Sequence, residues 1–426
     1  MYKIFLLLLI SIFLVSCATS SIAPKPNEKV FEAEDAYILF ALHAEEIHDY
    51  ESAAKLYDEL YKKAHKKEYL YKFLKNNILL KKNDIVIKKV DEISKKEQFD
   101  PILVRLKIVA LLGELKLDEA KNIGIELSKM TKSPDDYILV SEIYVALKEY
   151  DLALKYLEGA YVKEYNEKIL DRMAIVLYVN LDRKKDAIAE LETYTRMMGC
   201  SELICNRLIG FYSNENNIDG LLSTYLRLYE LNKKDEIARK IIQIYTYTKE
   251  YVKLMDFLEK SGADDRTLLQ IYTSSKNYKK AYLLADKLYK KTAEVKYLGQ
   301  SAIYEYESKG GDVDKKTLNC VVNKLREVIK KDNSPLYFNY LGYILIDHDL
   351  DVQEGIRYVK KVIKLQPNSI YYLDSLAWGY YKLHKCKKAK EIMDRIEKLG
   401  GSKEIEVISH MKEINRCIKY KKGKRK

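Results

Sequence analysis

Two groups of side chains in this 426-residue chain are of the kinds that bind metal ions. His43 and His48 are five residues apart, which is ~140° around a helix, so they do not share one face as two ligands of one ion must. Residues 347–351, DHDLD, begin like a calcium loop, but Val352 stands where the sharp turn needs glycine and Tyr358 where the bidentate glutamate belongs. We interpret residues 347–351 as an acidic turn between helices and expect no metal cofactor.

Nucleophilic catalysis and phosphate binding find as little support. The pairs Gly310-Gly311 and Gly400-Gly401 are isolated, and neither begins a glycine-rich phosphate loop. No serine or cysteine can be assigned a base by spacing, and carboxylates on repeated helices are ordinarily solvated. We therefore expect this chain not to be an enzyme.

The chain begins with a short apolar segment. Lys3 precedes twelve apolar or small residues, Ile4 to Val15, which as a helix reach only ~18 Å, too short for a ~30 Å hydrocarbon core. The pattern predicts a signal peptide over residues 1–16. Leu14-Val15-Ser16-Cys17 also resembles the lipobox of bacterial lipoproteins, which implies cleavage before Cys17 and a covalent lipid on its sulfur. A standard signal peptide with an incidental cysteine is the alternative.

Residues 17–32 are expected to form the lipidated cysteine and a polar, flexible tether. In lipoproteins that the inner membrane retains, the residue after the cysteine is usually aspartate, whereas here it is Ala18. The resemblance therefore implies an outer-membrane location facing the periplasm.

Charge is concentrated at the end of the chain. The formal net charge is +12, but Lys3 leaves with the signal peptide and the last eight residues, KYKKGKRK, hold six basic residues, so the body carries about +5. We interpret residues 421–426 as a basic tail that is solvated or that touches anionic lipid or cell-wall polymer. An exported chain is not expected to bind nucleic acid.

Five cysteines remain besides Cys17, in a compartment that favours disulfides. Cys200 and Cys205 are close enough in sequence to bridge. Since five is odd, at least one thiol stays free or pairs between chains.

Helical periodicity is nearly continuous, and two landmarks recur along it. They advance by 33, 34, 34, 33 and 27 residues. The first is a tyrosine or leucine (Leu111, Tyr144, Tyr178, Tyr212, Tyr245, Tyr272), and the second, nine residues later, is small or apolar (Ala120, Ala153, Ala187, Leu221, Leu254, Ala281).

The clearest copies are LVSEIYVALKEYDLALKYLEGA at 139–160 and YLDSLAWGYYKLHKCKKAKEIMDRI at 372–396. In each, small residues let two antiparallel helices approach, and a tyrosine fills the space beside that contact. This pattern resembles the tetratricopeptide repeat, closely over about 335–396 and by periodicity elsewhere. The resemblance implies an all-α, right-handed α-solenoid of about eleven helix pairs over residues 33–398.

Residues 399–420 are expected to form a further amphipathic helix that caps the last repeat. If this helix runs antiparallel to residues 386–398, Cys417 returns to within about a turn of Cys386. The sequence therefore predicts a Cys386–Cys417 disulfide.

In such a solenoid the first helices line the concave surface. Counting six residues back from each landmark tyrosine, and then four forward, places polar side chains in this groove: Arg172, Asn206, Arg239, Gln243, Arg266 and Gln270. Arginine presents five donors in a rigid fork, which suits carboxylates and backbone carbonyls. We hypothesise that this column binds an acidic or C-terminal peptide segment, although polar residues on a solvated face would give the same pattern.

An aromatic stripe follows near the end of the chain. Tyr371, Asp374, Trp378 and Tyr381 are spaced 3, 4 and 3 residues apart, and Tyr343 adjoins them from the previous repeat. Large aromatic side chains with a polar group are typical anchors of interfaces, but the stripe is equally consistent with half-buried packing between helices.

These observations favour a scaffold or adaptor whose groove binds envelope proteins or peptide segments. The family resemblance implies the assembly of motility, secretion or cell-wall machinery, without selecting among them. The alternative is a peptidoglycan- or sugar-binding module that positions a cell-wall enzyme, in which Trp378 and some of the 37 tyrosines stack on sugar rings.

Overall fold

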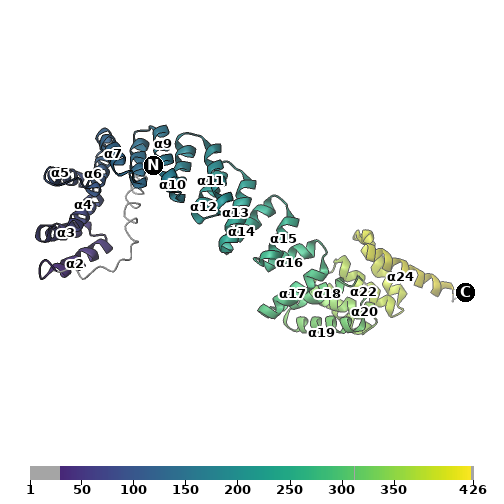
Figure 1. Cartoon of the computed structure of the whole chain (residues 1–426). Helices are drawn as coiled ribbons and strands as arrows, with labels where there is room; N and C mark the ends of the chain where they lie inside the picture. The colour runs from purple at the N-terminus through teal and green to yellow at the C-terminus, as the bar shows by residue number, and fades with distance from the viewer. Residues whose placement is uncertain (1–28, 311, 424–426) are drawn as a thin grey trace. The chain divides into compact units, whose positions relative to one another are not determined.

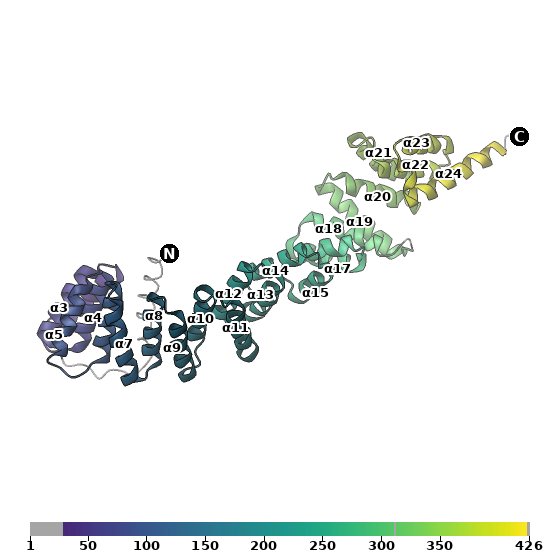
Figure 2. The ribbon, with the colours of Figure 1, turned by 90° about the horizontal axis from the view of Figure 1, so that it is seen from above.

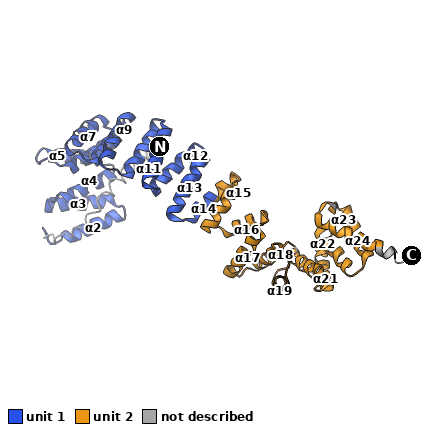
Figure 3. Cartoon of the chain, turned by 45° about the vertical axis from the view of Figure 1, so that its right-hand side comes forward, with its two compact units in different colours: residues 1–241 blue, residues 242–426 orange. Residues whose placement is uncertain are grey.

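The computed structural model describes residues 29–310 and 312–423. Within these residues the regular elements are helices, and there is no strand (Figure 1). Consecutive helices pair and pack on the next pair within each of two compact units, which the chain forms up to Ile241 and from Ile242 onward (Figure 3). The predicted all-α solenoid of helix pairs is confirmed.

The first unit contains six helix pairs and the start of a seventh in its described residues. The pairs are α2 (Glu34–Glu46) with α3 (Tyr50–Ala64), α4 (Lys67–Leu79) with α5 (Asn83–Ser94), α6 (Pro101–Gly113) with α7 (Leu117–Thr131), α8 (Pro134–Ala146) with α9 (Tyr150–Lys163), α10 (Glu167–Ile175), extended by a π-helical turn (Val176–Asn180), with α11 (Lys184–Met198), and α12 (Glu202–Asn214) with α13 (Ile218–Asn232).

The seventh pair spans the boundary between the units, and four further pairs and a final helix follow. They are α14 (Asp235–Tyr247) with α15 (Tyr251–Ser261), α16 (Asp265–Ser274) with α17 (Tyr278–Thr292), α18 (Val295–Glu307) with α19 (Lys315–Lys331), α20 (Pro335–Asp347) with α21 (Val352–Leu365), α22 (Ile370–Lys382) with α23 (Cys386–Lys398), and α24 (Ile405–Gly423).

The landmarks of the sequence repeat lie in the core. Every member of the first column is buried, with no side chain more than 8% exposed. In the second column all are buried except Leu221, which is half-buried and packs against the core around Tyr212. The small residues therefore lie where the two helices of a pair approach most closely.

At five of the six positions of the first column, the residue's carbonyl also closes the first helix of its pair, whereas beside Tyr178 the carbonyl of Leu177 accepts the bond. Lys116 N donates to the carbonyl of Leu111 at 2.9 Å, and Glu149 N donates to the carbonyl of Tyr144 at 2.9 Å. The residue before each donor lies in the left-handed region, as Leu115 and Lys148 do at φ 59° and 63°. This bond from an amide to the carbonyl five residues earlier is a Schellman-type closure, which satisfies carbonyls that the helix end leaves without partners.

The final helix, α24, packs against both α22 and α23 (Figure 2). It covers the apolar surface that the last helix pair leaves open, through Val407 and Ile414. No helix among the described residues is long and apolar enough to cross a membrane.

Candidate functional site

In the first unit, arginines on first helices are paired with carboxylates on the neighbouring first helix. Arg105 on α6 donates from Nε and Nη2 to Asp136 on α8 at 2.6 and 2.8 Å. Arg207 on α12 donates in the same way to Asp171 on α10, at 2.6 and 2.9 Å. Two parallel N–H···O bonds are a strong and geometrically specific form of ion pair, so these pairs fix successive helix pairs to one another.

Arg172, predicted to face the groove, belongs to the same network. Its Nη1 donates to Glu142 on α8, and the two side chains are 19% and 13% exposed. Burial raises the pKa of the Glu142 carboxyl, although the guanidinium favours its charged form. Arg172 is thus engaged by its neighbour, whereas the predicted groove residues Asn206 on α12 and Arg239 and Gln243 on α14 are exposed.

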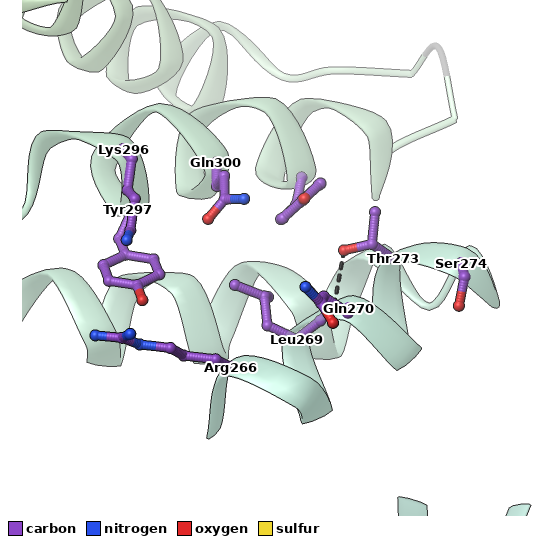
Figure 4. A pocket seen from close by; sticks show the side chains of 9 residues that line it. Arg266, Leu269, Gln270, Thr273, Ser274, Lys296, Tyr297 and Gln300 are labelled. Carbon is purple, nitrogen blue, oxygen red and sulfur yellow. Dashed lines mark hydrogen bonds between the residues drawn. The ribbon is translucent and has the colours of Figure 1, made fainter. Parts of the chain in front are cut away.

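In the second unit, an open hollow of about 480 Å³ lies between α16 and α18. It contains Arg266 and Gln270, the last two residues of the predicted column, and α18 contributes the side chains that face them. Figure 4 shows Tyr297 and Gln300 pointing from α18 towards α16. The remaining lining residues are Leu269, Thr273, Ser274, Lys296 and Tyr304.

Two cations border this hollow and share one carboxylate. Lys296 Nζ lies 2.6 Å from Glu294 and 4.7 Å from the centre of the Tyr297 ring. The hydrogen bond between them raises the pKa of Lys296 and lowers the pKa of Glu294. Arg266 Nη2 lies 3.7 Å from the same carboxylate, and its side chain is 70% exposed. Its donors therefore remain accessible to a carboxylate from outside the chain.

The hollow also presents two side-chain amides. Gln270 is exposed one turn after Arg266. Gln300 is half-buried, and its buried Oε1 accepts no hydrogen bond within the described residues. The exposed amide of Gln270 is the group that a peptide backbone entering the hollow can reach. The hollow thus offers cationic donors for a carboxylate and an amide for a peptide backbone.

The aromatic stripe has a different environment, because α24 covers most of it. The Trp378 ring lies between two partners, with its centre 4.6 Å from that of Tyr381 and 4.0 Å from that of His410 on α24. Asp374 accepts a hydrogen bond from His410 Nδ1 at 2.9 Å, and Tyr343 lies 6.4 Å from the same imidazole, centre to centre. Tyr371, in contrast, is 63% exposed.

The cysteines fall into three groups. Disulfides join Cys200 to Cys205 and Cys386 to Cys417, with Cα–Cα separations of 5.8 and 6.0 Å, which lie in the usual range for bridged cysteines. Cys320 on α19 is exposed and unbridged. Cys17, the predicted lipidation site, and the predicted signal peptide lie outside the described residues.

The side chains considered for metal binding do not gather. His43 and His48 are both exposed, and no cluster of three or more histidine, cysteine, aspartate or glutamate side chains that could hold an ion occurs among residues 29–310 and 312–423. In the acidic turn, Asp347 accepts the Trp378 Nε1 hydrogen bond at 2.8 Å, and Lys382 Nζ donates to Asp349 at 2.8 Å. Both carboxylates therefore tie this turn to α22.

Comparison with known proteins gives similarities of structure only. No known family matches the sequence, and no curated protein matches it. Among solved structures, the chain is similar to the APC/C hetero-tetramer Cut9–Hcn1, with 11% identity, coverage of 90% of this chain and 97% of that one, and a TM-score of 0.42. It is also similar to PilF of Pseudomonas aeruginosa, with 15% identity, coverage of 47% and 92%, and a TM-score of 0.35.

A third similar structure is Naa15/Naa10 bound to HypK-THB, with 13% identity, coverage of 86% of this chain and 64% of that one, and a TM-score of 0.28. All three TM-scores are below 0.5.

Four participants in these sites were not singled out from the sequence. Lys296, Tyr297 and Gln300 on α18 line the hollow with Arg266 and Gln270, about one repeat period further along the chain. A search for polar residues one period apart could have found Lys296 and Gln300. His410 carried no such signal, because its helix lies outside the repeat.

Proposed function

We propose that this chain is a protein-binding scaffold of the bacterial envelope that holds carboxylate-bearing peptide segments in the hollow between α16 and α18. The observation that carries the proposal is the Arg266 guanidinium, which is exposed and only loosely held at 3.7 Å from Glu294, in the hollow that also contains the exposed amide of Gln270. An acidic side chain or a C-terminal carboxylate matches the first group, and a peptide N–H matches the second.

The location is part of the proposal. The apolar segment at residues 4–15 and the lipobox-like Leu14–Cys17 support a lipid anchor at Cys17 in the outer membrane, facing the periplasm. The repeated helix pairs support a binding role, since solenoids offer an extended surface on which partners lie. The chain would thus bring envelope proteins together at the membrane, in assemblies for motility, secretion or cell-wall synthesis.

Fluorescence anisotropy with labelled peptides tests the binding site. We expect peptides with an acidic C-terminus to bind, and the same peptides with an amidated, neutral C-terminus to bind more weakly. Arg266→Glu replaces the hydrogen-bond donor by a carboxylate, which has the same charge as the peptide's carboxylate. This variant should weaken binding by at least about tenfold, which corresponds to ~1.4 kcal/mol. Arg357→Glu is the matched control, because Arg357 is exposed on the second helix α21, in the same unit.

Equal affinity of the two variants would contradict the proposed site. Retention of the purified chain by isolated cell-wall sacculi, together with no binding of acidic peptides, would instead favour the peptidoglycan-binding function.

A further inference from the structure

The surface beneath α24 has the features of a helix-binding site. We define the α20–α22 face as Asn339, Tyr343, Asp374 and Trp378, which lie on two neighbouring first helices. The helix α24 places His410 on this face, where its ring stacks on Trp378 and its Nδ1 meets Asp374. The face therefore accommodates an amphipathic helix through an aromatic ring and a buried carboxylate.

Two polar atoms on this face are buried without partners. Asp374 is 7% exposed at its side chain, and while its Oδ2 is bonded to His410, its Oδ1 is buried and accepts no hydrogen bond in the described part of the chain. The same holds for Oδ1 of Asn339, one turn before Tyr343. One imidazole N–H cannot satisfy both carboxylate oxygens, so a ligand with more donors would fit better.

The start of α24 also meets a like charge. Burial and the nearby negative charge of Glu406 raise the pKa of the Glu307 carboxyl on α18, while a hydrogen bond from Tyr340 acts in the opposite direction. Two carboxylates that approach one another in a partly buried place disfavour the contact when both are charged. A hydrogen bond from Tyr343 to Glu406 acts against this repulsion, so the start of α24 is held by one polar contact and opposed by another.

The apolar stripe of α24 is narrow. Val407, His410 and Ile414 are buried, at 2%, 6% and 0% exposure, whereas Ile405 is 86% exposed. Met411 is half-buried and packs against the same apolar cluster, so the apolar contact of α24 rests on these few side chains. The disulfide from Cys417 to Cys386, which closes 31 residues of chain, supplies the remaining constraint.

We propose that the α20–α22 face is a binding surface for an amphipathic helix of another protein. Within the chain α24 occupies this face, and the Cys386–Cys417 disulfide controls whether the other helix can displace α24. The partner helix carries aliphatic residues at i and i+7, as Val407 and Ile414 do, and an arginine at i+3 in place of His410. A guanidinium donates to both oxygens of a carboxylate and stacks on an indole ring.

The exchange begins with reduction of the bridge. A dithiol reductant transfers two electrons and two protons to the disulfide, which leaves thiols at Cys386 and Cys417 and a disulfide in the reductant. Without the bridge, only the short connection to α23 holds α24 near the α20–α22 face, and an external helix can compete for that face. This surface is separate from the α16–α18 hollow, so the inference does not depend on the peptide-binding proposal.

The test uses the purified chain and a labelled peptide of residues 403–419 in which Cys417 is replaced by serine. We expect Cys386→Ser/Cys417→Ser to bind this peptide at least about tenfold more tightly than the oxidised wild-type chain, in which α24 is linked to its own site. A peptide with His410→Arg should bind several-fold more tightly still. Cys200→Ser/Cys205→Ser is the matched control, since it removes the other disulfide, and should bind as weakly as the wild type.

Trp378→Ala in the Cys386→Ser/Cys417→Ser background should abolish binding, with helical circular dichroism as the check on folding. Equal affinity of the wild type and the Cys386→Ser/Cys417→Ser variant, or binding that survives Trp378→Ala, would overturn the proposal. Hydrogen exchange on the wild-type chain gives a readout without substitutions. Reduction should speed exchange of the α24 amides at least about tenfold and leave α22 unchanged, and unchanged α24 exchange would also overturn it.

Discussion

The ion pair between Arg105 and Asp136 allows a quantitative test of how successive repeats are joined. Asp136 is fully buried, and it accepts hydrogen bonds from Arg105 Nε and Nη2 at 2.6 and 2.8 Å and from Thr131 Oγ1 at 2.5 Å. Arg105→Met removes two of these three donors and leaves the carboxylate buried. Breaking a buried pair costs ~3–5 kcal/mol, and because the Arg105 side chain is 24% exposed and admits water, we expect the lower limit, ~3 kcal/mol.

The assay is urea denaturation combined with hydrogen exchange. In a solenoid each repeat contacts only its neighbours, so the loss should concentrate in the amides of α6 to α9. Arg105→Met/Asp136→Asn should lose less stability than Arg105→Met alone, because no charge remains buried without a partner. Arg183→Met is the control, since Arg183 pairs with Asp186 in an exposed i, i+3 contact whose loss should cost at most ~0.5 kcal/mol.

A loss below ~1 kcal/mol for Arg105→Met, or a double variant less stable than the single one, would refute the reasoning that these arginines join repeats.

Three further predictions follow from single contacts. Arg172→Met removes the ion pair with Glu142, so it should lower the free energy of unfolding by ~1–3 kcal/mol and leave the affinity for acidic peptides within about twofold. Lower affinity with unchanged stability would instead place Arg172 in the binding site. Burial raises the pKa of the Glu34 carboxyl, but hydrogen bonds from Lys66, Tyr69 and the Val30 amide lower this pKa to about 2, below its ordinary value of 4.5. The stability that Glu34 contributes is therefore present above pH ~4.5 and is lost as the pH falls towards 2. Glu34→Gln should therefore destabilise α2 by ~1.5–3 kcal/mol at pH 7, as measured by hydrogen exchange, and the difference from the wild type should shrink between pH 5 and 2. Gly355→Ala should lower the free energy of thermal unfolding by ~1–3 kcal/mol, because the new Cβ would meet the Gly342 carbonyl oxygen at 2.5 Å. Gly210→Ala is the control: its new Cβ has open space around it in a helix, so this variant should be as stable as the wild type or more stable.

The sequence predicts the repeat frame well because the same physical requirement recurs in every helix pair. Tyr144 and Ala153 lie in the core, as their spacing indicates, since two helices approach only where a small side chain meets a larger one. The turn between them could not be predicted in detail. Lys148 and Leu115 adopt left-handed φ values that usually call for glycine, and the helix closure offsets the ~1–2 kcal/mol that this conformation costs.

The site residues could be predicted only where their positions depend on the spacing within a single helix. Arg266 and Gln270 share one face of α16 by their spacing alone, and the structure places both in one hollow. The engagement of Arg172 by Glu142 depends on the distance between two neighbouring first helices, which periodicity does not give. The sequence predicts that a helix caps the last pair, but it does not predict that this helix places His410 on the Trp378 ring, because His410 lies outside the repeat.

Site-specific photo-cross-linking in cells tests the central claim most directly. A photoreactive phenylalanine analogue replaces Gln270, which is exposed in the α16–α18 hollow, or Arg357, which is exposed on α21. We predict adducts with one or a few envelope proteins from position 270, their loss when Arg266→Glu is added, and no such adducts from position 357. Equal adducts from both positions, or adducts from position 270 that survive Arg266→Glu, would contradict the claim that the hollow holds carboxylate-bearing partners.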